Sequence, residues 1–154
     1  MNIVDIENYI MQTFKDVYPL DTWGEKSFFL NPGKKFKRGT YFATIKKKDG
    51  DNDKASKLDR DGVFRLNIGI NKEEFLSLFY TMPKRPAKGC FIKGGYDFQA
   101  LDTILPHPIY GWMSWICILN PSVSRFDECK KYLQVAYEKA LIVTDKKSKQ
   151  IINE

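Results

Sequence analysis

The sequence has few of the residues that build metal and disulfide sites. It contains a single histidine, His107, and three cysteines, Cys90, Cys117 and Cys129. One histidine excludes HExxH zinc proteases and histidine-rich metal centres, and no two cysteines form a CxxC pair. An odd number of cysteines without framework spacing fits free thiols in a reducing compartment. We therefore expect no metal, no cofactor, no disulfide, and a cytoplasmic location.

Long hydrophobic runs are also missing. The longest, from Gly111 to Leu119, is about half of the ~20 residues that a membrane-spanning helix needs. Residues 1–7 carry Asp5 and Glu7 where a signal peptide would have apolar residues. These absences predict a chain that is neither exported nor inserted into a membrane.

Common catalytic and ion-binding motifs are absent or incomplete. The glycines show neither the GxxxxGK nor the GxGxxG spacing of phosphate-binding loops. Residues 49–53 resemble the start of a calcium loop, but Lys54 stands where glycine is required and Arg60 where glutamate should bind. Ser114 is not part of a GxSxG nucleophile motif. The sequence therefore favours a binding function over catalysis.

The hydrophobic pattern predicts one folded domain. The 154 residues are 43% hydrophobic and 29% charged, as in ordinary globular proteins. Helical periodicity covers residues 3–18, 71–80 and 124–141, with a short helix over 98–105, and strand patterns cover 26–31, 40–47, 63–70 and 112–120. This order predicts an α+β fold, an antiparallel sheet of about four to five strands with the N-terminal and C-terminal helices packed mainly on one face. We expect a single domain over residues 1–144 and a frayed tail over 145–154.

Positive charge is concentrated in one segment. The net charge is +6, and the stretch from residue 34 to residue 48 has seven basic residues and no acidic one. These residues are Lys34, Lys35, Lys37, Arg38, Lys46, Lys47 and Lys48. One interpretation is a basic hairpin that binds nucleic acid. The other is that the lysines cover a turn and an edge strand and prevent aggregation.

The strand pattern over residues 63–70 contains a candidate binding group. Alternation of side chains puts Arg65, Asn67 and Gly69 on one face and apolar residues on the other. Arginine and asparagine two residues apart, beside a glycine that leaves room, could bind a carboxylate, a phosphate or a nucleobase. Alternatively, Arg65 lies on an outward face and pairs with Asp59 or Asp61.

A second candidate group surrounds the histidine. Pro106 and Pro108 fix the backbone on both sides of His107, and Tyr110 and Trp112 follow as a stacking wall. The imidazole titrates near neutral pH, so it could act as acid, base or ligand-binding donor. Alternatively, the ring binds a backbone carbonyl and only fixes the turn.

Three blocks carry a resemblance to a known family. Residues 56–69 (SKLDRDGVFRLNIG), 107–112 (HPIYGW) and 119–121 (LNP) resemble a bacterial family of unknown function, DUF6194. The resemblance spans nearly the whole chain and implies no activity. The element order is more loosely similar to MmcQ/YjbR-like domains, and this similarity implies a compact α+β fold and DNA binding.

The leading hypothesis is a non-catalytic binding module for a small anionic or planar ligand. Its site would consist of Arg65, Asn67, His107, Tyr110 and Trp112. The first alternative is nucleic-acid binding by the hairpin 34–48, and the second is an enzyme with His107 as general base. The expected oligomeric state is a monomer or a weak homodimer.

Overall fold

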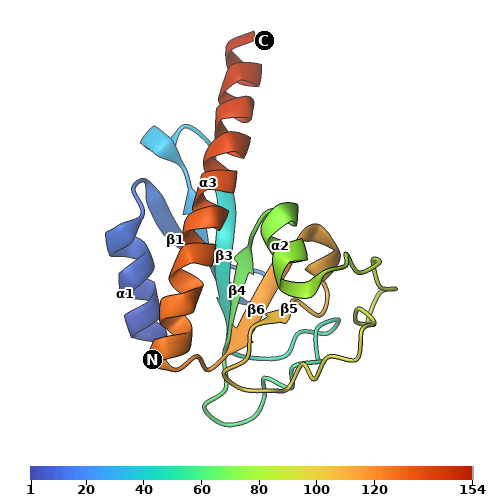
Figure 1. Ribbon diagram of the computed structural model, residues 1–154. Coiled ribbons are helices and arrows are strands. Elements are labelled where there is room, and N and C mark those ends of the chain that lie inside the picture. The colour runs from blue at the N-terminus through green and yellow to red at the C-terminus, as the bar shows by residue number, and fades with distance from the viewer. Residues whose placement is uncertain (154) are drawn as a thin grey trace.

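A six-stranded antiparallel sheet with helices on one face forms the fold. The computed structural model describes residues 1–153, and the strand order is β1-β2-β3-β4-β6-β5 (Figure 1). The elements are α1 (Ile3–Thr13), β1 (Val17–Thr22), β2 (Glu25–Leu30), β3 (Thr40–Lys46), β4 (Arg65–Gly69), α2 (Lys72–Phe79), β5 (Leu105–Pro106), β6 (Trp115–Leu119) and α3 (Val123–Asn153). Short 3-10 turns occupy Pro32–Lys34 and Gly111–Met113. The predicted α+β fold is confirmed, with six strands instead of four or five.

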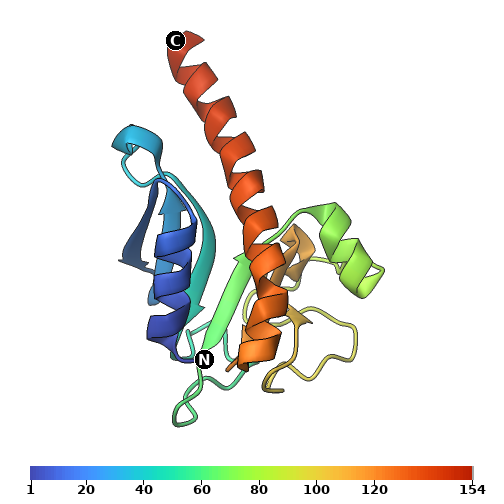
Figure 2. The same cartoon turned by 60° about the vertical axis from the view of Figure 1, so that its left-hand side comes forward.

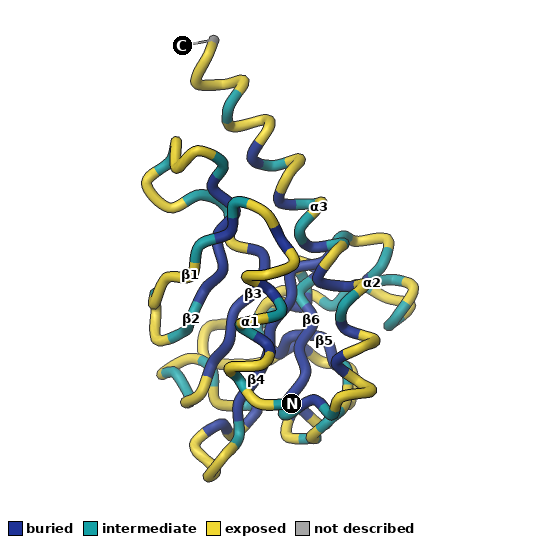
Figure 3. Tube along the Cα trace, turned by 90° about the vertical axis from the view of Figure 1, so that its left-hand side faces the viewer, coloured by how far each residue is buried: buried dark blue, intermediate teal, exposed yellow. Residues whose placement is uncertain are grey.

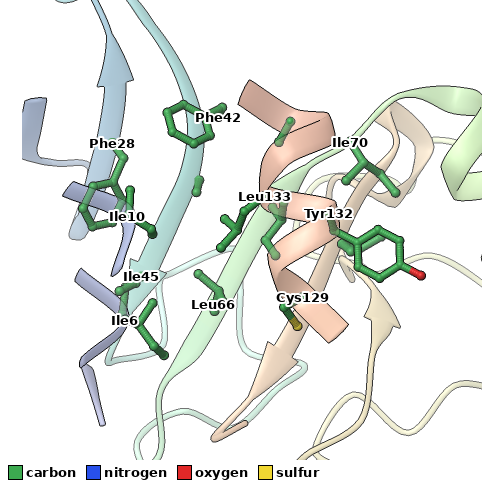
Figure 4. Close-up of a cluster of buried hydrophobic side chains, with 14 of the residues drawn as sticks. Ile6, Ile10, Phe28, Phe42, Ile45, Leu66, Ile70, Cys129, Tyr132 and Leu133 are labelled. Atoms are coloured by element: carbon green, nitrogen blue, oxygen red, sulfur yellow. The ribbon is translucent and has the colours of Figure 1, made fainter. Parts of the chain in front are cut away.

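The hydrophobic core lies between the sheet and the helices α1 and α3. Ile6 and Ile10 of α1 and Leu133 of α3 pack against Leu66 of β4 and its neighbours (Figure 4). The predicted strand alternation is confirmed here, because Leu66 and Ile68 face this core. Each fully buried aliphatic side chain of this kind contributes roughly 1.5–3 kcal/mol. The core covers one face of the sheet, so polar side chains are left to the other face.

The first helix is shorter than its periodicity predicts. The expected helix over residues 3–18 ends at Thr13, where Phe14 is already extended, and Asp16 with a positive φ of 63° then turns the chain. Val17 then begins the edge strand β1, opposite Leu30. Pro19 is tolerated there because an edge strand has one side without ladder hydrogen bonds. The predicted cap is confirmed, since Asn2 accepts a hydrogen bond from the Asp5 backbone at 2.8 Å.

Two other expectations fail in the C-terminal half. No helix forms over residues 98–105, and Leu105–Pro106 instead pair with β6. The last helix begins at Val123 with Ser122 as its cap, not Ser124, and it continues to Asn153 (Figure 2). Residues 145–153, expected as a frayed tail, are therefore helical, and residue 154 lies outside the described residues. Within the described chain, no helix is both long and apolar enough to cross a membrane.

The face of the sheet opposite α1 and α3 is polar in its centre. The strand register aligns Ser27, Thr44, Asn67 and Cys117 across β2, β3, β4 and β6. Two residues away on each strand, a second row on the same face consists of Glu25, Lys46 and Arg65. Figure 3 shows that these strands are buried, whereas the β2–β3 connection and the end of α3 are exposed. The polar centre of this face contains the candidate site.

Candidate functional site

Arg65 is the centre of a buried polar network. Its side chain has no exposed surface, although arginine is rarely buried. Nε donates to Asn67 Oδ1 at 2.8 Å, and Nη1 donates to Ser56 Oγ at 2.9 Å. Both terminal nitrogens donate to the Asp53 carboxylate, at 3.0 and 2.5 Å. Such a bidentate pair compensates the cost of burying the guanidinium.

The partners of Arg65 come from the long connection between β3 and β4. Asp53 and Ser56 lie on this connection, and their bonds to Arg65 hold it against the polar face. Burial by itself would raise the pKa of Asp53, but the hydrogen bonds and charge of Arg65 outweigh it and lower that pKa. Of the alternatives that the sequence left open, outward exposure with pairing to Asp59 or Asp61 is wrong. Asp59 instead accepts a hydrogen bond from the Asp49 backbone.

Asn67 connects Arg65 to the neighbouring strands. Because a guanidinium only donates, the Asn67 oxygen must face Arg65 and its amide nitrogen must point away. That nitrogen donates to Thr44 Oγ1 at 2.9 Å and approaches Glu25 Oε2 at 3.4 Å. Thr44 therefore uses a lone pair for Asn67 and keeps its own hydroxyl proton for another acceptor.

His107 is buried beside Arg65 and is held neutral. Its Nδ1 accepts hydrogen bonds from the backbone of Ile109 and Tyr110 at 3.0 and 3.1 Å. Nε2 lies 3.3 Å from Arg65 Nη2, a group that only donates, so these backbone contacts and Arg65 compete for the one lone pair of the neutral ring. Burial and then the charge of Arg65 lower the pKa of His107 well below its usual value. The alternative of a ring that binds a backbone carbonyl is wrong, because the ring instead meets the backbone N–H groups of Ile109 and Tyr110 in the turn.

An aromatic-walled pocket of about 280 Å³ opens next to Asn67 and His107. Its polar lining includes Glu25, Ser27 and Thr44. Its walls and rim are formed by Trp23, Tyr41, Tyr110, Met113 and Trp115. Burial, followed by the nearby Tyr110 and Glu25, raises the pKa of Tyr41, as expected for a phenol facing this pocket. A planar group could stack on these rings while its edge meets the polar lining.

Four of the five predicted site residues are together, and one is not. Arg65, Asn67, His107 and Tyr110 surround or underlie the pocket, whereas Trp112 packs against the Arg85 guanidinium at 4.9 Å and does not line it. Trp112 lies in the 3-10 turn that ends at the left-handed Ser114, and Trp115 begins β6.

Trp115 occupies the position that the sequence pattern predicts for Trp112. A Cβ on Gly69 would lie 2.7 Å from the Trp115 ring, so the room left by Gly69 is filled by this indole. Sequence reasoning also missed Glu25, Thr44 and Asp53. The available signal on β2 and β3 was the polar residues Ser27 and Thr44 within otherwise aromatic and apolar strands.

The basic segment separates into two groups at opposite ends of β3. Lys34, Lys35, Lys37 and Arg38 lie exposed on the β2–β3 connection, whereas Lys46–Lys48 lie at the far end. A strand of this length separates them by roughly 20 Å. Lys46 is only 6% exposed and approaches Glu25 at 3.9 Å. The segment 34–48 is therefore not one continuous patch.

Other hollows and polar groups lack the same convergence. A hollow of about 660 Å³ lies beside Lys46–Gly50 and α1, and one of about 370 Å³ lies between residues 51–57 and 89–99. Among residues 1–153, no group of three or more histidine, cysteine or acidic side chains is placed to hold a metal ion. The aromatic-walled pocket is the hollow in which buried polar side chains and several aromatic rings meet.

Comparison with known proteins identifies the family. The model of a family of unknown function, DUF6194, matches residues 1–149, and the chain belongs to this family. No curated protein and no solved structure matches the chain. The looser similarity to MmcQ/YjbR-like domains is not shown.

Proposed function

We propose that this member of the DUF6194 family is a binding module for a small planar ligand that carries polar edge atoms. The observation that supports it most strongly is the pocket lined by the buried polar Thr44, Asn67 and His107 together with the aromatic Tyr41, Tyr110 and Trp115. Aromatic walls favour a flat molecule, and a few fixed polar groups select its edge. The volume of about 280 Å³ favours a ligand of one or two rings.

The polar lining defines the chemistry of that edge. Thr44 has a free hydroxyl proton to donate, and the Glu25 carboxylate can accept. A ring with an acceptor next to an N–H or NH₂ donor fits both groups. Cytosine and adenine have such an edge, so heteroaromatic bases are suitable probes.

An anionic ligand has less support than a planar one. The Arg65 guanidinium is fully buried and its charge is matched by Asp53, so it does not offer a charge to a ligand. Glu25 in the pocket would repel an anion. The buried, inaccessible position of Arg65 instead supports a role in orienting Asn67 and His107.

A hydrolytic or proton-transfer function with His107 as general base also has less support. Whichever ring nitrogen carries the lone pair, it already faces a donor: Nδ1 faces the N–H groups of Ile109 and Tyr110, and Nε2 faces Arg65 Nη2. A general base needs a lone pair within reach of the substrate proton. The expected location remains a reducing cytoplasm, on the basis of the free thiols.

The test is ligand titration followed by NMR. Adenine and cytosine are added to ¹⁵N-labelled protein, and cyclohexanol serves as a non-planar control. We expect shifts of the Asn67 side-chain amide and the Trp115 indole with either base and none with cyclohexanol. The absence of shifts at these two groups up to millimolar base would overturn the proposal.

A matched pair of variants tests the assigned edge. Thr44→Val keeps the shape but removes the hydroxyl, so base affinity is expected to fall about fivefold, because one neutral hydrogen bond contributes about 1 kcal/mol. Thr103→Val makes the same chemical change at an exposed site outside the pocket and should leave affinity unchanged. Equal affinities for both variants would argue against the assigned role of Thr44.

A further inference from the structure

Four exposed cations lie on the β2–β3 connection, and one of them, Arg38, contacts a residue that lines the pocket. Lys34, Lys35, Lys37 and Arg38 are exposed there, and residues 31–48 contain no acidic side chain. In the described part of the chain, none of these four side chains makes an ion pair. Their charge is therefore available to an external anion.

Two of these cations lie over aromatic rings. Lys34 Nζ is 4.8 Å from the Tyr18 ring centroid, and the Arg38 guanidinium is 5.4 Å from that of Trp23. Cation–π contacts hold the side chains near the sheet and leave their donors facing solvent. The Trp23 contact matters most, because Trp23 also lines the pocket.

A row of aromatic rings connects Arg38 to the interior of the pocket. Trp23 is 6.0 Å from Tyr41, and Tyr41 is 5.5 Å from Trp115, measured between ring centroids. Trp23 is 68% exposed and Tyr41 43% exposed, although large aromatic side chains are usually buried. One cation therefore adjoins the mouth of the pocket, and three more extend from it along the hairpin tip.

We propose that the planar group in the pocket is an unpaired base of a single-stranded nucleic acid whose backbone runs onto the hairpin tip. This inference rests on the proposed function. The exposed aromatic rings offer stacking faces, and Lys34, Lys35, Lys37 and Arg38 offer several phosphate contacts, more than a free base or one nucleotide needs. A paired duplex would not fit, because its base faces are stacked and its Watson–Crick edges are already paired.

The test measures fluorescence anisotropy with labelled 12-mers. Single-stranded DNA, single-stranded RNA and a DNA duplex of matched sequence are titrated from 50 to 200 mM salt. We expect micromolar binding of the single strands and weaker binding of the duplex. With three to four phosphates neutralised, log K should fall against log salt with a slope of about −2 to −3. The DNA and RNA arms distinguish the two sources of the same chemistry, and binding of either supports the inference.

Variants separate the backbone contacts from the base contact. The triple variant K34A/K35A/K37A should weaken binding at least tenfold and flatten the salt slope by about 2, since every phosphate left without its cation reduces the slope by ~0.7. Tyr41→Leu should weaken binding without changing the slope, because it removes stacking alone. The control K84A/K88A/K93A removes the same charge from another exposed segment and should bind as the unaltered chain does.

Three outcomes would overturn the inference. They are equal loss of affinity in the hairpin and control variants, duplex binding as tight as single-strand binding, and no binding of any 12-mer at 50 mM salt. If free adenine or cytosine still binds at Asn67 and Trp115 while the 12-mers do not bind, the planar-ligand function stands and only the nucleic-acid inference fails. If neither binds, both fail.

Discussion

The Asp53 carboxylate contacts the Arg65 guanidinium through both of its oxygens, at 3.0 Å from Nη1 and 2.5 Å from Nη2. This pair joins the β3–β4 connection to the middle of the sheet. It also completes the surroundings of Arg65, which in turn orients Asn67 through the 2.8 Å bond from Nε. The shape of the candidate site therefore depends on a residue that does not line the pocket.

Removing the partner of Arg65 should destabilise the fold strongly. Asp53→Ala leaves a buried guanidinium without its counter-ion, and breaking such a pair costs about 3–5 kcal/mol. Urea unfolding should show a decrease in stability of that size. Asp51→Ala removes an exposed carboxylate from the same connection and should change stability by less than about 0.5 kcal/mol. Similar small decreases in both variants would show that the pair is not needed.

His107 should make stability depend on pH just below neutrality. Burial and Arg65 lower the pKa of His107 in the folded state, so the unfolded chain binds a proton first, near pH 6.5. The stabilising contribution is complete above pH 6.5 and is lost as the pH falls, by about 1.4 kcal/mol per pH unit.

Urea unfolding from pH 7.5 to 5.0 measures this dependence. Since the chain contains one histidine, His107→Gln should remove the slope in this range. Retention of the full slope in the variant would contradict the assignment to His107. Asp53, whose pKa is also lowered, contributes in a separate range, because its stabilisation is lost only below about pH 4.

Gly69 should be intolerant of a methyl group because of Trp115. The added Cβ would lie 2.7 Å from the indole, which must then move into the pocket, at a cost of about 1–3 kcal/mol. In a double-mutant cycle, Trp115→Leu should relieve most of this cost in Gly69→Ala. Strictly additive effects would show that the clash is not with Trp115.

The start of α3 gives a direct comparison of two serines. Ser122 Oγ accepts from the Arg125 backbone at 3.2 Å, whereas Ser124 is an exposed residue of the first turn. Ser122→Ala should cost about 1 kcal/mol, as expected when a helix cap is removed. Ser124→Ala should cost less than about 0.5 kcal/mol. Thermal unfolding of the two variants measures these losses. A larger loss for Ser124→Ala than for Ser122→Ala would show that Ser124 is the cap.

Only one thiol should react in the folded protein. Cys90 is exposed, whereas Cys117 and Cys129 are buried. Burial raises the pKa of both buried thiols to about 12, so little thiolate forms at neutral pH. Titration with a disulfide reagent should release one equivalent rapidly and none from Cys90→Ser. Fast reaction of a second thiol would show that the core opens.

The sequence by itself determined most of the helices, the central strands and part of the site. Local signals were sufficient where they agreed with packing, as in the Asn71 cap of α2 and the alternation of Arg65 and Asn67 in β4. The signals failed where tertiary contacts decided the outcome. Val17 continues the helical period of α1 but pairs with Leu30 as an edge strand.

Only the tertiary structure decided which residues meet at the site. Asp53 and Arg65 are separated by a connection without periodicity, and no local rule selects Asp53 over Asp59 or Asp61. Trp115 and not Trp112 reaches the pocket because the chain makes a 3-10 turn before it enters β6, so that Trp115 is the residue that pairs with Gly69. Side-chain alternation is set by the nearest backbone, so sequence can predict it. Pairing across the sheet depends on the register of distant strands and on burying a charge against its counter-ion, and those energies exist only after folding.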